Sequence, residues 1–295
     1  MNAVSRVAPE QHQHELNGVE LVWFTWPGRG PAASEPPILL VHATGFHARC
    51  WDQVVRHLGD RRVIAVDMRG HGRSGNTPPI SWDAFGQDLS ALVAHLGLEG
   101  AVGVGHSMGG HTLVQAAADH PVAFSRLLLV DPVIMAPEFY GAAPSWIEGD
   151  EHPTAKRRNN WQSWEEMFER FRDRMPFAAW DPAVLEDYCR WGLVPDAEGD
   201  GLVLACPPKV EAAIYMGSAA RSIYELLPEI RIPVTVLRAR PRPAVRDAMD
   251  FSSSPTWPEL AQQFPDGHDV HLPELSHFIP MEAPALVAEY ILGRS

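Results

Sequence analysis

The sequence predicts an α/β domain with a doubly wound, mostly parallel sheet and an inserted helical segment. Three observations support this fold class. Short apolar segments rich in Val, Ile and Leu alternate with segments of helical periodicity, as in a sheet with helices on both faces. The alternation stops between residues 136 and 221, where aromatic residues concentrate. One apolar segment leads directly into a Gly-x-Ser-x-Gly motif at residues 105–109, a pattern typical of a tight turn from a strand to a helix.

The predicted strands are short apolar runs of the kind that parallel sheets bury on both faces. We expect parallel strands at residues 37–42, 62–67, 101–105, 127–130, 233–237 and 270–272. Residues 20–26 are predicted to form an antiparallel edge strand ahead of them.

The helices are predicted from periodicity and from their end signals. In residues 82–96, apolar side chains recur at helical spacing, Ser81 can cap the start, and Gly97 follows the end. Further helices are expected at residues 112–119, 257–264 and 283–292.

The break in the alternation divides the chain into regions. Residues 1–18 are predicted to be a flexible tail, 19–135 and 222–295 the α/β core, and 136–221 a helical cap insertion. One helix of the insertion is expected to carry four aromatic side chains on a single face. These side chains are Trp161, Trp164, Phe168 and Phe171. The charged run at residues 156–158 is interpreted as a solvated turn.

Composition excludes several function classes. The formal net charge of −13 and the pI of about 5.5 argue against binding to nucleic acid or to anionic membranes. No segment has the length of a membrane span or the pattern of a secretion signal. Cys50, Cys189 and Cys206 are odd in number and widely spaced, which argues against a disulfide framework and a zinc site. We therefore expect a cytoplasmic protein with free thiols and without a metal or cofactor. The oligomeric state is not predicted.

The Gly-x-Ser-x-Gly motif places Ser107 at the apex of the predicted turn, with its hydroxyl free to attack. Gly105 and Gly109 are small because neighbouring backbone crowds their positions. The backbone N–H of Met108, the residue immediately after Ser107, can stabilise an oxyanion. A glycine-rich turn with an incidental serine has the same local pattern. The other candidate catalytic groups in the sequence must therefore distinguish the two interpretations.

A serine nucleophile requires a base that accepts its proton. His277 is the candidate, because it lies on a late loop between a predicted strand and the last helix. Two nearby histidines are interpreted as structural: His271 within the strand and His268 in a turn before it. His106 is expected to support the turn at Ser107 rather than to act as the base.

An oxyanion needs a second donor, and the loop at residues 42–46 follows an earlier predicted strand. We expect the backbone N–H of Thr44 to face the pocket. His42 is interpreted as a structural hydrogen-bonding residue beneath this loop.

Together these motifs resemble the α/β-hydrolase superfamily over about residues 19–292, nearly the whole chain. The motifs that carry the resemblance lie at residues 42–45, 67–74, 105–109 and 276–278. Ala43 stands where the family usually has glycine, a small change that the loop should tolerate. The resemblance implies that residues 67–74 form a structural turn. A serine at the apex excludes the family members that use an aspartate nucleophile, such as epoxide hydrolases.

Two regions of the chain contain candidate carboxylates for the acid that orients His277. In most of the family it follows the strand that corresponds here to residues 233–237, and Asp247 and Asp250 are the carboxylates available there. Some branches take it from the preceding strand end, which corresponds to Asp131. We favour Asp131 because a strand end fixes it, whereas the later loop is long and rich in proline and serine.

The residues therefore predict a cofactor-independent serine hydrolase that cleaves an ester-like bond of a small, largely apolar substrate through an acyl-enzyme. The same groups could cleave a carbon–carbon bond or a lactone, or transfer the acyl group to another acceptor. A non-catalytic small-molecule receptor or scaffold is the alternative from a different class.

Overall fold

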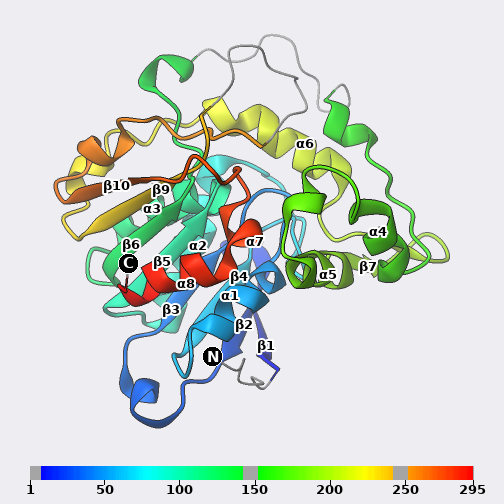
Figure 1. Ribbon diagram of the computed structural model, residues 1–295, viewed down its shortest axis with the longest axis horizontal. Helices are drawn as coiled ribbons and strands as arrows, with labels where there is room; N and C mark the ends of the chain where they lie inside the picture. The colour runs from blue at the N-terminus through cyan, green and yellow to red at the C-terminus, as the bar shows by residue number, and fades with distance from the viewer. Residues whose placement is uncertain (1–7, 142–151, 242–251, 295) are drawn as a thin grey trace.

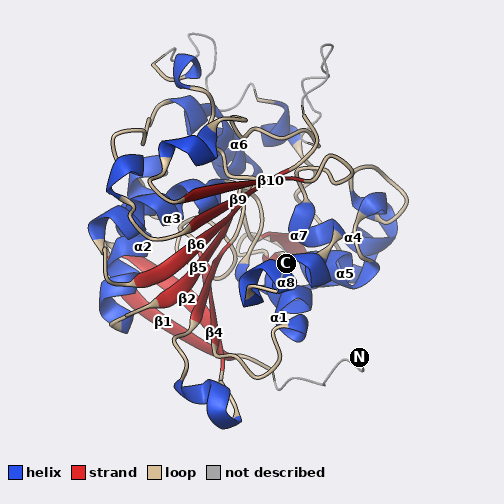
Figure 2. Ribbon diagram, turned by 60° about the vertical axis from the view of Figure 1, so that its left-hand side comes forward, coloured by secondary structure: helices blue, strands red, loops and turns tan. Residues whose placement is uncertain are grey.

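A computed structural model describes residues 8–141, 152–241 and 252–294 of the chain. An eight-stranded sheet runs through its centre in the order β1-β2-β4-β3-β5-β6-β9-β10 (Figures 1 and 2). The strands are β1 (Glu10–Leu16), β2 (Val19–Trp26), β3 (Ile38–Val41), β4 (Val63–Asp67), β5 (Ala101–His106), β6 (Phe124–Val130), β9 (Val234–Arg238) and β10 (Gly267–His271). Neighbouring strands from β4 to β10 are parallel, whereas β1 and β2 pair antiparallel to their neighbours. The mostly parallel sheet is thus confirmed.

Helices cover both faces of the sheet, as Figure 2 shows. One face packs against α2 (Trp82–Leu96) and α3 (Met108–Asp119), and the other against α1 (Asp52–His57) and α8 (Pro284–Leu292). Successive residues of β3 point to opposite faces of the sheet. Leu39 packs towards α2 and α3, whereas Leu40 packs towards α1 and α8. This double burial explains why the central strands are continuously apolar in the sequence.

The predicted limits of α2 are confirmed at both ends. The side chain of Ser81 accepts a hydrogen bond from the backbone N–H of Ala84, and Gly97 ends the helix with φ of +58°. By contrast, α3 begins four residues earlier than predicted, directly after Ser107. Its first turn contains Gly109 and Gly110, which hide the helical periodicity.

The prediction of a flexible tail at residues 1–18 needs correction. Residues 10–16 form β1, which pairs with β2 through a turn at Asn17 and Gly18, both at positive φ. Strand β2 is therefore the second strand of the sheet rather than its edge. Strand β1 lacks an apolar pattern because most of its residues are exposed, but the Asn-Gly pair is a strong hairpin signal.

The segment between β6 and β9 contains α4 (Trp164–Phe171), α5 (Pro182–Trp191) and α6 (Pro208–Met216). In Figure 1 the first two lie together beside one end of the sheet. Contrary to expectation, a short hairpin of β7 (Leu193–Pro195) and β8 (Leu202–Leu204) is also present. Trp161 precedes α4 in an isolated bridge with Leu202, so it does not share the predicted helical face.

Two predictions near the end of the chain also differ from the structure. The expected helix at residues 257–264 is only a 3₁₀ turn, and β10 begins at Gly267, so His268 lies in the strand rather than in a turn. A short helix, α7 (Ile279–Glu282), separates β10 from α8. The 3₁₀ helices are η1 (Gly30–Ser34), η2 (Ala48–Trp51), η3 (Pro137–Phe139), η4 (Pro153–Lys156), η5 (Phe177–Ala179), η6 (Gly217–Ala219), η7 (Leu227–Glu229) and η8 (Leu260–Gln263).

Candidate active site

Ser107 lies at a sharp turn between β5 and α3. Its backbone has φ of +58° and ψ of −117°, a conformation that is rare for a residue with a side chain. A Cβ added to Gly105 would lie 2.4 Å from the carbonyl oxygen of Gly109, and one added to Gly109 would lie 2.3 Å from that of Val41. Because both contacts are with backbone, only glycine fits at either position. The local sequence thus imposes the strained turn that presents Ser107.

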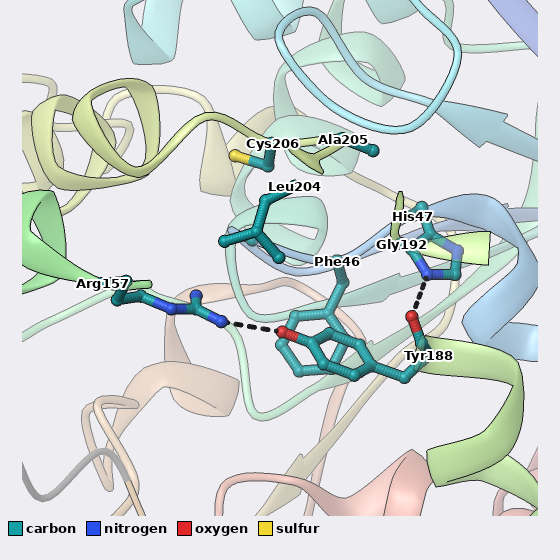
Figure 3. Close-up of a pocket in the computed structure, with 9 residues that line it drawn as sticks. Phe46, His47, Arg157, Tyr188, Gly192, Leu204, Ala205 and Cys206 are labelled. Carbon is teal, nitrogen blue, oxygen red and sulfur yellow. Dashed lines mark hydrogen bonds between the residues drawn. The ribbon is translucent and has the colours of Figure 1, made fainter. Parts of the chain in front are cut away.

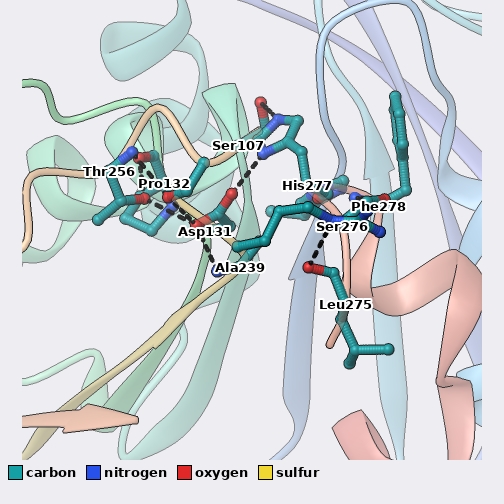
Figure 4. A network of polar contacts seen from close by, with 12 residues as sticks. Ser107, Asp131, Pro132, Ala239, Thr256, Leu275, Ser276, His277 and Phe278 are labelled. Carbon is teal, nitrogen blue, oxygen red and sulfur yellow. Dashed lines mark hydrogen bonds and ion pairs between the residues drawn. The ribbon is translucent and has the colours of Figure 1, made fainter. Parts of the chain in front are cut away.

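The imidazole of His277 faces Ser107, as Figure 4 shows. Its Nε2 lies 2.9 Å from Ser107 Oγ, and its Nδ1 lies 2.6 Å from Asp131 Oδ2. A carboxylate oxygen accepts hydrogen bonds, so Nδ1 donates to Asp131 in the neutral ring and Nε2 keeps its lone pair towards the serine hydroxyl. The structure therefore brings together Ser107, His277 and Asp131 in one hydrogen-bonded line.

Asp131 directly follows β6, is fully buried, and has φ of +44°. Its second oxygen, Oδ1, accepts hydrogen bonds from Ala239 N at 3.0 Å, Ser254 Oγ at 2.6 Å and Thr256 Oγ1 at 3.2 Å. These donors fix the carboxylate while Oδ2 remains available to His277. The alternative carboxylates Asp247 and Asp250 lie outside the described residues.

His106 supports the loop of His277. Its Nε2 donates a hydrogen bond of 2.8 Å to the backbone carbonyl of His277, and the two rings lie 5.2 Å apart. Burial and the neighbouring His277 lower the pKa of His106 to about 3, so this ring is neutral at ordinary pH. The hydrogen bond of His106 is therefore made with the histidine loop, and its expected support of the turn at Ser107 stays a prediction.

A carboxylate that sequence reasoning missed holds the other side of this loop. Glu282, in α7, accepts hydrogen bonds from the hydroxyl of Ser276 and, at 3.1 Å, from its backbone N–H. The Ser276 hydroxyl in turn accepts one from the backbone N–H of Phe278. His277 therefore lies between two residues that are fixed by side-chain contacts.

Histidine side chains join the 42–46 loop to the residues that follow β4. Met68 N donates to His42 Nε2 at 3.0 Å, and His42 Nδ1 donates to the carbonyl of Ala43, as its predicted structural role requires. Gly45 N donates to His71 Nε2 at 3.0 Å. Within the described part of the chain, no acceptor is found for the backbone N–H of Thr44. Met108 is the first residue of α3, where an N–H has no partner inside the helix.

Aromatic side chains join this loop to the inserted segment. The ring centroid of Phe46 lies 5.6 Å from that of Trp180, 5.3 Å from that of Tyr188 and 6.1 Å from that of Phe278. Trp180 and Tyr188 belong to the insertion, whereas Phe278 follows His277. One buried apolar cluster therefore borders both loops that carry the predicted site residues.

In the charged run at residues 156–158, Lys156 and Arg158 are exposed as expected, whereas Arg157 is only partly exposed and pairs with distant residues. Arg157 forms an ion pair with Glu211 of α6, whose side chain is only 6% exposed, and donates to the hydroxyl of Tyr188 at 3.1 Å. Together with Phe46, His47 and five other residues, Arg157 and Tyr188 line a small pocket (Figure 3). The sequence contains no local signal for this pairing, because its partners lie 54 and 31 positions away.

The titratable groups do not form a metal centre within the described residues, where no group of three or more His, Cys, Asp or Glu side chains could hold an ion. All three cysteines are buried, and they are not joined in disulfides. Among the described residues, no helix has the length and apolar character that crossing a membrane requires.

The chain is similar to known proteins over most of its length. Residues 38–290 match the model of the alpha/beta hydrolase family. The chain belongs to this family. Lipase LipV from Mycobacterium tuberculosis is 28% identical over 276 residues, which cover 90% of this chain and 94% of that protein.

Two further likenesses differ in their extent. An sn-1-specific diacylglycerol lipase from Mus musculus is 40% identical over 104 residues, which cover 34% of this chain and 33% of that protein. The crystal structure of an E-2-(acetamidomethylene)succinate hydrolase has a TM-score of 0.75 and covers 97% of this chain and 98% of that one. At 19% identity, that structure supports the fold alone. The fold and the lipase relatives together indicate a hydrolase.

Proposed function

We propose that this chain is a serine hydrolase that cleaves an ester-like bond of a small, largely apolar substrate through an acyl-enzyme. The observation that carries the proposal is the hydrogen-bonded line from Ser107 through His277 to Asp131. A nucleophile, a base and an orienting acid in this order are the requirements for acyl transfer by serine.

In the proposed mechanism, Ser107 Oγ bonds to the carbonyl carbon while its proton passes to His277 Nε2. Asp131 stabilises the resulting imidazolium through Nδ1. The carbonyl oxygen gains negative charge and accepts hydrogen bonds from the backbone N–H groups of Thr44 and Met108. The imidazolium then protonates the leaving alcohol as the ester C–O bond breaks.

Deacylation repeats these steps with water. His277 Nε2 takes a proton from water as the oxygen bonds to the acyl carbon, and then returns it to Ser107 Oγ as the acid product leaves. We further propose that residues 136–221 form a cap over the site. The aromatic cluster of Phe46, Trp180 and Tyr188 supports this assignment and favours an apolar substrate.

A fluorophosphonate probe and p-nitrophenyl acetate test the proposal together. Wild-type protein should be labelled at Ser107 and should turn over the ester, and Ser107→Ala should lose both properties. Ser125→Ala is a matched control, because Ser125 lies on β6 with its hydroxyl bonded to the carbonyl of Ala101. Ester turnover that persists in Ser107→Ala, or a wild-type protein that does not label, contradicts the proposal.

A further inference from the structure

The buried carboxylate of Glu211 lies directly against the 42–46 loop. Its Oε1 is 2.6 Å from the position that a Cβ on Gly45 would occupy. Gly45 has φ of +77°, a conformation that favours glycine, and the missing side chain leaves room for the carboxylate. Gly45 follows Thr44, whose N–H is the proposed oxyanion donor. Glu211 therefore contacts the backbone beside that donor.

Arg157 reaches the same loop by two routes. One side of its guanidinium pairs with Glu211, which touches Gly45. The other side donates to the hydroxyl of Tyr188, whose ring packs 5.3 Å from that of Phe46 (Figure 3). Both members of this pair belong to the inserted segment, because Arg157 directly follows η4 and Glu211 lies in α6. The insertion thus holds the loop on either side of the bond between Gly45 and Phe46.

We propose that Arg157 and Glu211 are positioning residues for the oxyanion loop, an inference that rests on the proposed hydrolase function. The pair fixes the backbone that carries the Thr44 N–H. Arg157 also neutralises a carboxylate that would otherwise oppose the negative charge developing on the substrate oxygen nearby.

The surroundings of Glu211 make this charge balance measurable. The titratable groups that face it are Arg157, Tyr188, Tyr215 and Cys206. Burial raises the pKa of Tyr188 to about 12 and raises those of Tyr215 and Cys206, so these three groups are neutral in the ordinary assay range. Burial also raises the pKa of Glu211, and Arg157 opposes this shift. Without Arg157, the protonation of Glu211 sets the charge beside the loop.

The decisive experiment compares Arg157→Gln with Arg157→Gln/Glu211→Gln on p-nitrophenyl acetate across the pH range in which wild type is active. We expect Arg157→Gln to lower kcat about ten-fold at alkaline pH, less than the loss of a whole oxyanion donor, with little change in KM. The ratio of variant to wild-type kcat should rise as pH falls and Glu211 becomes protonated. The double variant should lose this pH dependence and recover most of kcat.

Arg158→Gln is the matched control. Arg158 is the adjacent arginine and pairs with Glu166, and both side chains are more than a third exposed. The kcat of Arg158→Gln should equal that of wild type. A ratio for Arg157→Gln that does not change with pH, or a double variant as slow as the single one, overturns the positioning role. If Arg157→Gln does not fold, Glu211→Asp replaces it, because the shorter side chain keeps the charge but withdraws from Gly45. Unchanged kcat in Glu211→Asp then overturns the inference.

Labelling separates failure of this inference from failure of the proposed function. If Ser107→Ala retains ester turnover, the hydrolase proposal fails and the inference fails with it. If Ser107→Ala is inactive and unlabelled while Arg157→Gln behaves as Arg158→Gln does, only the positioning role is overturned.

Discussion

Replacement of Asp131 by asparagine tests the proposed acid through the tautomer of His277. The three donors around Oδ1 require an acceptor there, so the amide oxygen of the new side chain in Asp131→Asn should take that place. The amide NH₂ then points at His277 Nδ1, where Oδ2 lay 2.6 Å away. A ring that accepts at Nδ1 carries its proton on Nε2 and cannot take one from Ser107.

The expected loss is large because the base is placed in the wrong protonation state. We expect kcat for p-nitrophenyl acetate to fall about 10⁴-fold, the loss that follows when this exchange leaves the geometry of a serine enzyme intact. The substitution is nearly isosteric, so the melting temperature should change little. Initial rates at saturating ester, with a thermal melt of the same sample, measure both quantities.

Asp269→Asn is the control for this experiment. Asp269 lies on β10 and pairs with Arg238 at the surface, so its loss should leave kcat unchanged. A fall of less than about ten-fold in folded Asp131→Asn contradicts the reasoning. The acid would then have to come from elsewhere, and Asp247 and Asp250 would be the next residues to replace.

Three further substitutions test other parts of the structure. Gly109→Ala should abolish activity and cost roughly 3 kcal/mol or more of stability in urea unfolding, whereas Gly217→Ala, which meets only ordinary contacts, should cost little. His106→Leu should lower kcat about ten-fold by releasing the His277 loop, and His106→Gln, which keeps a donor, should restore part of the loss. Burial raises the pKa of Asp187 to about 7, so ionisation of this carboxyl opposes folding. The free energy of unfolding of Asp187→Asn should therefore equal that of wild type near pH 4 and exceed it increasingly up to pH 7, by a few kcal/mol. If Asp187→Asn is less stable than wild type at alkaline pH, the expected gain in stability is contradicted.

The features that could be predicted from the sequence depend on neighbours along the chain. The turn at Ser107 follows from Gly105 and Gly109, whose positions exclude any side chain. The limits of α2 follow from Ser81 and Gly97, which act on their own helix ends. The buried strands were recognisable because both their faces are covered, which makes them continuously apolar. In each case the pattern that supports the prediction lies within a short stretch of the sequence.

The features that were not predicted have no apolar or charge pattern of their own in the sequence. Arg157 sits in a short basic run of the kind that is usually solvated, and only the fold brings Glu211 to it. Glu282 has no pattern of its own, because its contact with Ser276 depends on the single turn of α7. Strand β1 is polar and exposed, so its pairing leaves no apolar trace. The pair of Arg157 and Glu211 is a contact between distant residues, whereas the contact of Glu282 and the pairing of β1 are local and leave no apolar pattern.

The position of Asp131 follows from the order of the strands. Ser107 follows β5 and Asp131 follows β6, and these strands are adjacent and parallel, so their carboxyl ends lie side by side. Strand β9 pairs with the other edge of β6, and the residue after it, Ala239, donates its backbone N–H to Asp131. The strand end that carries the acid in most of the family thus contributes a donor here. Asp131 uses this contact to hold its carboxylate towards His277.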